Sequence, residues 1–156
     1  TRRYAGIMDA LSEANVPASN IREIDYHTVF GSSAESTSSY KSYEELFFPV
    51  NYTAVIGFND LQSYSAMEIL QKKGYRIPED ISLISFDNLR KTHTYLPPLT
   101  SIADNSEKSI ADTAVSILLD KIRNPSSEIS SKVLPVSIFD GHTTGPINET
   151  FAHSFE

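Results

Sequence analysis

The clearest pattern of hydrophobic and polar positions in the chain runs from residue 53 to residue 88. It opens with a short apolar run at 53–57, whose β-branched side chains are typical of a strand buried on both faces. Apolar residues then recur at helical spacing over 61–73, and Gly74 stands where helices commonly end. A second apolar run at 81–86 predicts another buried strand. We therefore expect a strand, a helix and a strand.

Polar residues follow both strands of this unit. Two parallel strands joined by a helix cross over right-handed, so both strands end at the same edge of the sheet. Asn59 and Asp60 follow the first strand, and Asp87 and Asn88 follow the second. Because open α/β sheets bind ligands at this carboxyl edge, the sequence predicts a ligand site there.

The rest of the chain continues to alternate between strand-like and helix-like segments. The alternation predicts an α/β fold with three layers and a parallel, doubly wound sheet. Outside the central unit, the predicted helices are 3–14, 40–48 and 106–123, and the predicted strands are 21–26, 99–103 and 133–139. One face of the helix at 106–123 is expected to meet a core through Ile110, Ala114, Ile117 and Leu118. The tail from residue 145 is expected to fray.

Composition suits a single domain. A chain of 156 residues with 40% hydrophobic side chains can build a core. No apolar run approaches the ~20 residues of a membrane helix, so we expect no membrane partner. A net charge of −7 argues against direct DNA binding by these residues, because nucleic-acid binders are more often basic. The absence of cysteine excludes disulfides and thiol catalysis and suits a cytoplasmic protein.

Motifs for catalysis or cofactor binding are missing from the sequence. The four histidines, His27, His93, His142 and His153, lack the spacing of metal ligands, and no cysteine joins them. Neither the G-x-S-x-G motif of hydrolases nor the G-x-x-x-x-G-K-[ST] phosphate loop occurs. We therefore expect neither an enzyme nor a metal or cofactor site.

Four separate blocks of sequence carry a family resemblance. They are FND at 58–60, GYRIPEDISLISFDN at 74–88, YLPPLTSI at 95–102 and LPVSIFDGHTT at 134–144. In this order and spacing they resemble the LacI/GalR family of bacterial transcription regulators. The resemblance covers residues 2–144. It implies the C-terminal subdomain of a periplasmic-binding-protein-like, effector-binding core.

The resemblance also implies a domain organisation. Residues 1–144 are expected to form the C-terminal part of the effector-binding domain, with 133–144 crossing back toward an N-terminal subdomain and 145–156 forming a tail. That second subdomain and the DNA-binding helix-turn-helix domain are expected outside this chain. So is the first, central strand of the sheet, which in the family lies between the strands matching 21–26 and 53–57. Its absence would leave unpaired backbone groups in the sheet.

Three candidate ligand-binding residues stand at strand ends. The Asn59 amide offers donors and an acceptor to a polyol, with a helix N-cap as the alternative role. The Asp87 carboxylate can accept two sugar hydroxyls, with a loop salt bridge as the alternative. The resemblance supports both as effector contacts and adds Asp104, whose position faces the cleft in relatives. Asp60 suits a structural role in the first helical turn.

Further site residues come from the resemblance and from sugar chemistry. Arg3, in the pattern Arg-x-x-Gly, matches an effector-binding arginine of the family, and its donor fork suits paired hydroxyls or a carboxylate. Sugar sites usually add an aromatic ring, for which Tyr26 is the first candidate and Phe30 the second; a core position is the alternative for both. One departure is His142, which stands near where relatives usually carry an arginine.

The function that the resemblance implies is sensing. The chain is expected to bind a small effector, a sugar or sugar derivative, within a dimeric repressor whose absent domain binds operator DNA. Effector-driven closure of the subdomains would change operator affinity. Tyr64 and Tyr95 match positions of the family's dimer interface, with core or surface roles as the alternative. The alternative function is a periplasmic sugar-binding protein of a transporter, which shares the fold.

Overall fold

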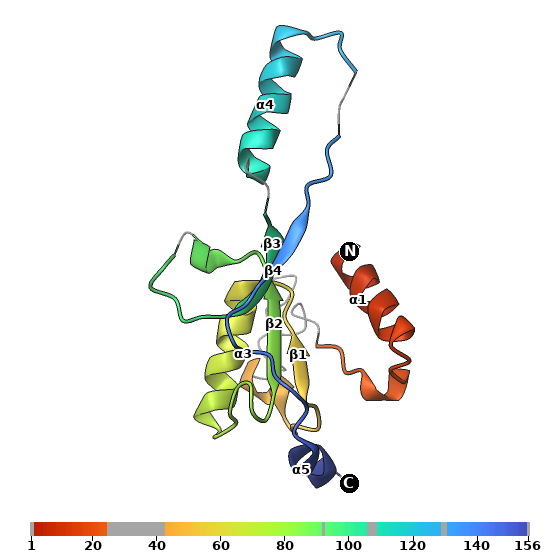
Figure 1. Cartoon of the computed structure of the whole chain (residues 1–156), viewed down its shortest axis with the longest axis vertical. Helices are drawn as coiled ribbons and strands as arrows, with labels where there is room; N and C mark the ends of the chain where they lie inside the picture. Colours follow the sequence, from red (N-terminus) through yellow and green to blue (C-terminus); the bar gives the residue numbers. More distant parts are fainter. Residues whose placement is uncertain (1, 25–42, 92, 106–108, 129–130, 156) are drawn as a thin grey trace, which may run out of the picture.

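The computed structural model describes residues 2–24, 43–91, 93–105, 109–128 and 131–155 (Figure 1). Its helices are α1 (Arg2–Glu13), α3 (Asp60–Lys72), α4 (Ile110–Arg123) and α5 (Glu149–Ala152). Its strands are β1 (Ala54–Ile56), β2 (Ser82–Phe86), β3 (Thr100–Asp104) and β4 (Val136–Phe139). Short 3-10 helices lie at η1 (Ala18–Asn20), η2 (Tyr43–Phe47), η3 (Leu89–Lys91) and η4 (His153–Phe155). The predicted unit of strand, helix and strand is confirmed as β1, α3 and β2.

One mixed sheet joins the strands in the order β1-β2-β3-β4. β1, β2 and β3 are parallel, with Val55 opposite Leu83 and Ile84 opposite Thr100. β4 pairs antiparallel with β3, whereas the sequence predicted only parallel strands. The chain leaves β3, forms α4 beyond the sheet and returns, so β4 runs back along β3 (Figure 1). The α/β class is confirmed, and the direction of the last strand is the correction.

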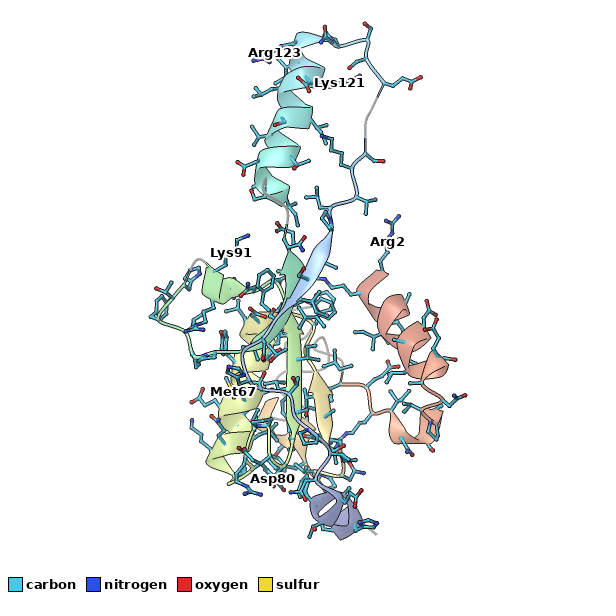
Figure 2. The ribbon with its side chains drawn as sticks, viewed as in Figure 1. Arg2, Met67, Asp80, Lys91, Lys121 and Arg123 are labelled. Atoms are coloured by element: carbon cyan, nitrogen blue, oxygen red, sulfur yellow. The ribbon has the colours of Figure 1, made fainter. Side chains whose placement is uncertain are left out.

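The core lies between α3 and the sheet. Its buried cluster contains Met67, Leu83 and Leu99, with Val55, Tyr64 and Ile77 packed against it. Met67 reaches this cluster from α3 (Figure 2). Ala66 and Leu70 of the same helix are also buried, because with Met67 they lie on the face that covers the sheet. This packing fixes the amino end of α3 at the carboxyl edge of β1.

The β1 side of the sheet is less covered than the sequence predicted. β1 is an edge strand in the described part of the chain, and its Ala54 and Ile56 are exposed. α1 has no buried residue and stands apart from the sheet (Figure 1). Residues 21–24 form no strand, and the rest of the strand predicted at 21–26 lies outside the described residues. The predicted burial of β1 on both faces is wrong for the described residues, because Ala54 and Ile56 share one face of the strand and that face is exposed.

α4 projects beyond the carboxyl edge on an arm that includes β3 and β4, with Lys121 and Arg123 at its far end (Figures 1 and 2). Thr113 is its one buried residue. Ile110 and Leu118 are 62% and 58% exposed, so the predicted contact of this helix with a core is wrong for the described residues. β3 carries the chain past the end of the core before α4 begins, which leaves the apolar face of α4 uncovered.

A strap formed by residues 140–145 runs along the amino ends of β2 and β3. The Thr143 carbonyl accepts from the Leu83 amide at 2.7 Å, and the Thr143 hydroxyl donates to the Leu83 carbonyl at 2.6 Å. The same hydroxyl accepts from the Thr100 amide at 2.9 Å. Thr143 therefore links β2 and β3 where their direct pairing ends.

The tail that was predicted to fray instead forms α5. The Asn148 side chain caps this helix and donates to the Asp80 carboxylate at 3.3 Å. The rings of Tyr75 and Phe151 meet edge to face, with their centroids 5.9 Å apart. The Arg76 side chain also bonds to Asp80 and holds the pKa of that carboxyl at about 2. These contacts attach the tail to the turn that follows α3.

We expect Gly141→Ala to lower the free energy of unfolding by at least about 2 kcal/mol, because the strap passes too close to Leu99 for a side chain. A Cβ at Gly141 would lie 2.2 Å from the Leu99 carbonyl carbon. Gly6→Ala is the matched control: no atom lies within 4 Å of its Cβ position, so a helical alanine should be neutral or stabilising. Denaturant unfolding followed by circular dichroism measures both. An unchanged midpoint for Gly141→Ala would contradict the close approach.

Candidate functional site

Arg3 and Asp87 meet at the carboxyl edge of the sheet. Arg3 lies in the first turn of α1, and Asp87 directly follows β2. The Arg3 Nη2 lies 2.6 Å from the Asp87 Oδ1, and each side chain is 40% exposed. The Arg3 Nη1 also donates to the Phe58 carbonyl at 2.9 Å. Two predicted site residues, 84 positions apart, thus form a solvent-accessible pair of guanidinium and carboxylate.

Two aromatic rings accompany this pair. The Arg3 guanidinium carbon lies 5.4 Å from the Phe58 ring centroid and 5.0 Å from that of Phe86, within the range of cation–π attraction. Phe58 is 51% exposed, so part of its ring faces solvent beside the guanidinium. Neither ring was predicted from the sequence, which pointed instead to Tyr26 and Phe30; these two residues lie outside the described residues. The available signal was position: each ring immediately precedes the polar residues at a strand end.

Asn59 caps α3. Its backbone is extended, with a φ of −154°, and its Oδ1 accepts from the Gln62 amide at 3.0 Å. This is the N-cap role that the sequence predicted as the alternative to ligand binding. Capping uses only the oxygen of the amide. The Nδ2 group therefore keeps two donors at the edge that holds Asp87.

Asp60 crosslinks three elements beneath this edge. Only 1% of the residue is exposed, yet both carboxylate oxygens are bonded. Its Oδ2 accepts from the Leu89 amide at 2.6 Å, and its Oδ1 accepts from the Ser101 hydroxyl at 2.7 Å. The structural role expected from its place in the first helical turn is thereby extended to a link among α3, η3 and β3.

The turn that presents Asp87 has an unusual backbone. Asp87 and Asn88 have φ values of 99° and 49°, a region that residues other than glycine rarely adopt. The Asp87 amide donates to the Ile102 carbonyl at 2.9 Å, and the Asn88 amide donates to the Ser101 hydroxyl at 2.9 Å. β3 therefore holds both strained residues.

Two residues singled out by sequence lie farther from the Arg3–Asp87 pair. Asp104 ends β3 two positions beyond Ile102, the register partner of Phe86, so it lies farther out on the ribbon of β3 and β4. His142 is exposed and lies 3.2 Å from the Asp140 carboxylate on the strap. The strap follows the amino ends of the strands, so the departure at His142 falls at the opposite end of the sheet from Asp87.

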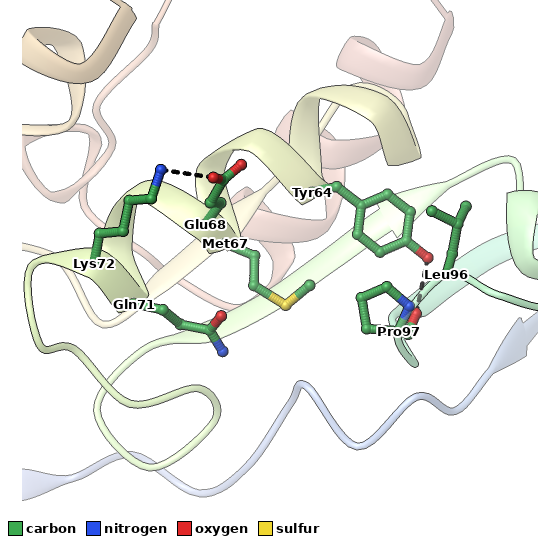
Figure 3. Close-up of a pocket in the computed structure, with 7 residues that line it drawn as sticks. All are labelled: Tyr64, Met67, Glu68, Gln71, Lys72, Leu96 and Pro97. Carbon is green, nitrogen blue, oxygen red and sulfur yellow. Dashed lines mark hydrogen bonds and ion pairs between the residues drawn. The ribbon is translucent and has the colours of Figure 1, made fainter.

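A groove of about 480 Å³ lies along α3, and we call it the α3 groove (Figure 3). Its lining residues are Tyr64, Met67, Glu68, Gln71, Lys72, Leu96 and Pro97. The Tyr64 hydroxyl donates to the Pro97 carbonyl at 3.0 Å, which fastens the loop after η3 to the helix. Burial raises the pKa of the Tyr64 hydroxyl above its ordinary value. Tyr95, on the same loop, is 80% exposed.

Among the described residues, no group of three or more His, Cys, Asp or Glu side chains is placed to hold a metal ion. None of the helices in the described part of the chain is both long and apolar enough to span a membrane.

A family model described as a periplasmic binding protein-like domain matches residues 1–144. The chain is 35% identical over 127 residues to the HTH-type transcriptional repressor PurR of Aliivibrio salmonicida (strain LFI1238), which covers 81% of this chain and 36% of that protein. This chain therefore spans about a third of the length of the curated relatives that it matches.

Solved structures of similar proteins share the fold. The periplasmic binding protein/LacI transcriptional regulator of Alkaliphilus metalliredigens QYMF, complexed with D-xylulofuranose, has a TM-score of 0.64 and 26% identity over 92% of this chain and 51% of its own. The dimeric Lac repressor with an 11-residue C-terminal deletion has a TM-score of 0.56 and 28% identity over 67% of this chain and 38% of its own. The chain belongs to the LacI/GalR family of transcriptional regulators, as part of their periplasmic binding protein-like domain.

Proposed function

We propose that this chain is the C-terminal subdomain of the effector-sensing domain of a transcriptional repressor, and that its effector is a sugar or sugar derivative. The observation that carries the proposal is the Arg3–Asp87 pair at the carboxyl edge, where open α/β sheets bind ligands. Effector binding changes operator affinity, and the complete protein acts in the cytoplasm.

The chemistry of this edge suits a polyhydroxylated ligand. The Asp87 carboxylate accepts hydroxyl donors strongly because the bonds are charge-assisted. The Arg3 guanidinium has further N–H groups beyond those bonded to Asp87 and Phe58. The exposed Phe58 ring offers a surface for the apolar face of a sugar. Asn59 adds two donors from its amide, and Asp104 extends the polar edge along β3.

The arm of β3, α4 and β4 supports a second subdomain as the other half of the site. Its helix presents Ile110, Leu118 and Ile122 to solvent, at 58–64% exposure, on a projection that leads away from the core. Such a face fits burial against another layer of the same protein. In this arrangement, residues 133–144 form a segment of chain that crosses between the two subdomains. Effector held between the subdomains stabilises the closed form, because it contacts both halves only there.

The alternative function, a transport receptor, has less support. Curated relatives with 34–35% identity are HTH-type transcriptional repressors, and the similar structures with 26% and 28% identity include LacI-type regulators. We therefore propose that operator DNA is contacted by a helix-turn-helix domain outside these residues. A non-enzymatic role agrees with relatives that are regulators.

A homodimer built on the α3 groove completes the proposal. The groove joins apolar Met67, Leu96 and Pro97 with the exposed ring of Tyr95 nearby. Tyr64 holds the loop that carries Tyr95, so the helix and the loop form one surface. The similar Lac repressor structure is of a dimer, and a two-fold regulator suits a two-fold operator.

Asp87→Ala in the full-length protein should weaken effector binding by about 1.5–3 kcal/mol, the cost of losing a charged hydrogen-bond acceptor. A thermal-shift screen of sugars and sugar phosphates identifies the ligand, because a bound ligand stabilises the folded state. Isothermal calorimetry then measures the affinities. Asp9→Ala, which removes an exposed carboxylate from α1, is the control and should bind as the parent does. Unchanged affinity in Asp87→Ala would remove Asp87 from the site.

Two substitutions at Asn59 separate capping from ligand binding. Asn59→Asp retains the cap oxygen but loses both N–H donors, so stability should be unchanged while effector affinity falls by about 1.5–3 kcal/mol. Asn59→Ala should lose about 1 kcal/mol of stability as well. Denaturant melts and calorimetry on the full-length protein give the two quantities. If Asn59→Asp binds effector as tightly as the parent, Asn59 is a cap and nothing more.

Tyr64→Asp combined with Tyr95→Asp should convert the full-length dimer into monomers, because each subunit would place two carboxylates in an apolar contact. Multi-angle light scattering measures the mass. Tyr64→Phe combined with Tyr95→Phe is the matched control, since it keeps both rings and should remain dimeric. A dimer that survives the double aspartate substitution would place the interface elsewhere.

A further inference from the structure

Asp60 and Ser101 form a buried pair directly beneath the proposed effector site. Asp60 is 1% exposed and Ser101 is fully buried, and the Ser101 hydroxyl donates to Asp60 at 2.7 Å. Neither side chain reaches solvent, so neither is placed to touch an effector. Their remaining hydrogen-bonding capacity is directed at the chain that follows β2.

The pair holds two consecutive backbone amides. The Ser101 hydroxyl accepts from the Asn88 amide at 2.9 Å, and the Asp60 carboxylate accepts from the Leu89 amide at 2.6 Å. The Ser101 hydroxyl has one hydrogen, which it gives to Asp60, so its lone pair is available to Asn88. The two side chains are thus bonded to each other, and each also accepts a hydrogen bond from one backbone amide of the turn.

This turn contains two left-handed residues without the freedom of glycine. Asp87 and Asn88 have φ values of 99° and 49°, so the conformation persists only where surrounding bonds enforce it. Asp87 is the residue whose carboxylate meets Arg3 at 2.6 Å. A change of backbone angle at either residue would redirect that carboxylate.

We propose that Asp60 and Ser101 are positioning residues of the effector site: by holding the Asn88 and Leu89 amides they keep the turn left-handed and aim the Asp87 carboxylate at Arg3. For effector affinity this rests on the proposed function of the Arg3–Asp87 edge. The geometric part, from buried pair to turn to ion pair, stands independently of any ligand.

The test uses three variants of the full-length protein: Ser101→Ala, Asn88→Gly and the two combined. Ser101→Ala removes the acceptor of the Asn88 amide and one bond of Asp60. Asn88→Gly makes positive φ intrinsically accessible, so it should compensate for the lost hydroxyl. A role limited to general stability predicts no such compensation, because glycine adds no contact.

NMR provides the readout that needs no effector. In Ser101→Ala, we expect the amides of residues 88 and 89 to exchange with solvent at least about tenfold faster, and the Arg3 side-chain signals to lose the shift caused by Asp87. Amides of β1 should keep their exchange rates. The combined variant should recover the Arg3 signals. Parent-like Arg3 signals in Ser101→Ala, or no recovery in the combined variant, would overturn the positioning role.

D-xylulose is chosen as the probe because the similar structure from Alkaliphilus metalliredigens holds this sugar as D-xylulofuranose, and its titration by calorimetry provides the second readout. We expect its affinity to fall about tenfold in Ser101→Ala and to return to within about threefold of the parent in the combined variant. Asp87→Ala is measured in parallel. If Asp87→Ala binds D-xylulose normally while the NMR changes occur, the proposed site fails and the positioning geometry holds. If Asp87→Ala loses affinity but Ser101→Ala changes neither readout, the positioning role fails and the site holds.

Discussion

A carboxylate that leaves water must have both oxygens bonded, or its burial costs several kcal/mol. Asp60 meets this condition with the start of α3 held against η3 on one side and β3 on the other. The hydrophobic contacts of α3 with the sheet tolerate small shifts, whereas bonds of 2.6 Å and 2.7 Å do not. The buried Asp60 carboxylate therefore fixes α3 relative to η3 and β3. The position of the carboxyl edge, where Asp87 lies, depends on these bonds.

Parts of the fold were predictable because periodicity depends on local burial. Ala66 and Leu70 of the pattern over 61–73 lie on the face of α3 that covers the sheet, whereas Leu61 is exposed. The pattern was sufficient to predict the helix and its flanking strands. The same pattern in α4 indicated an apolar face but not what would cover it, and that face is exposed in the described residues. The direction of β4 escaped prediction because it depends on how the chain returns from α4, which spacing does not encode.

The site was predictable to the extent that topology brings strand ends together. Parallel pairing of β1 and β2 places Asn59 and Asp87 at one edge, as the crossover argument required. Arg3 was predicted only through the family resemblance, because the sequence around a helix-end arginine does not indicate a partner 84 positions away, here Asp87. The rings of Phe58 and Phe86 were missed because each looks like the end of an apolar run. Only their placement around the guanidinium gives them a polar partner.

The strap gives this subdomain an order of assembly. Thr143 bonds to Thr100 and Leu83, residues 43 and 60 positions earlier, and Gly145 bonds to Ser82 across 63 positions. β2 and β3 can begin to pair as soon as both have left the ribosome, but their amino ends wait for residues that are made much later. Closing such long loops delays these contacts. While α4 and β4 are being synthesised, the amino ends of β2 and β3 in the nascent chain therefore lack the hydrogen bonds that the strap later makes. During this period a chaperone or another chain can bind these open strand ends.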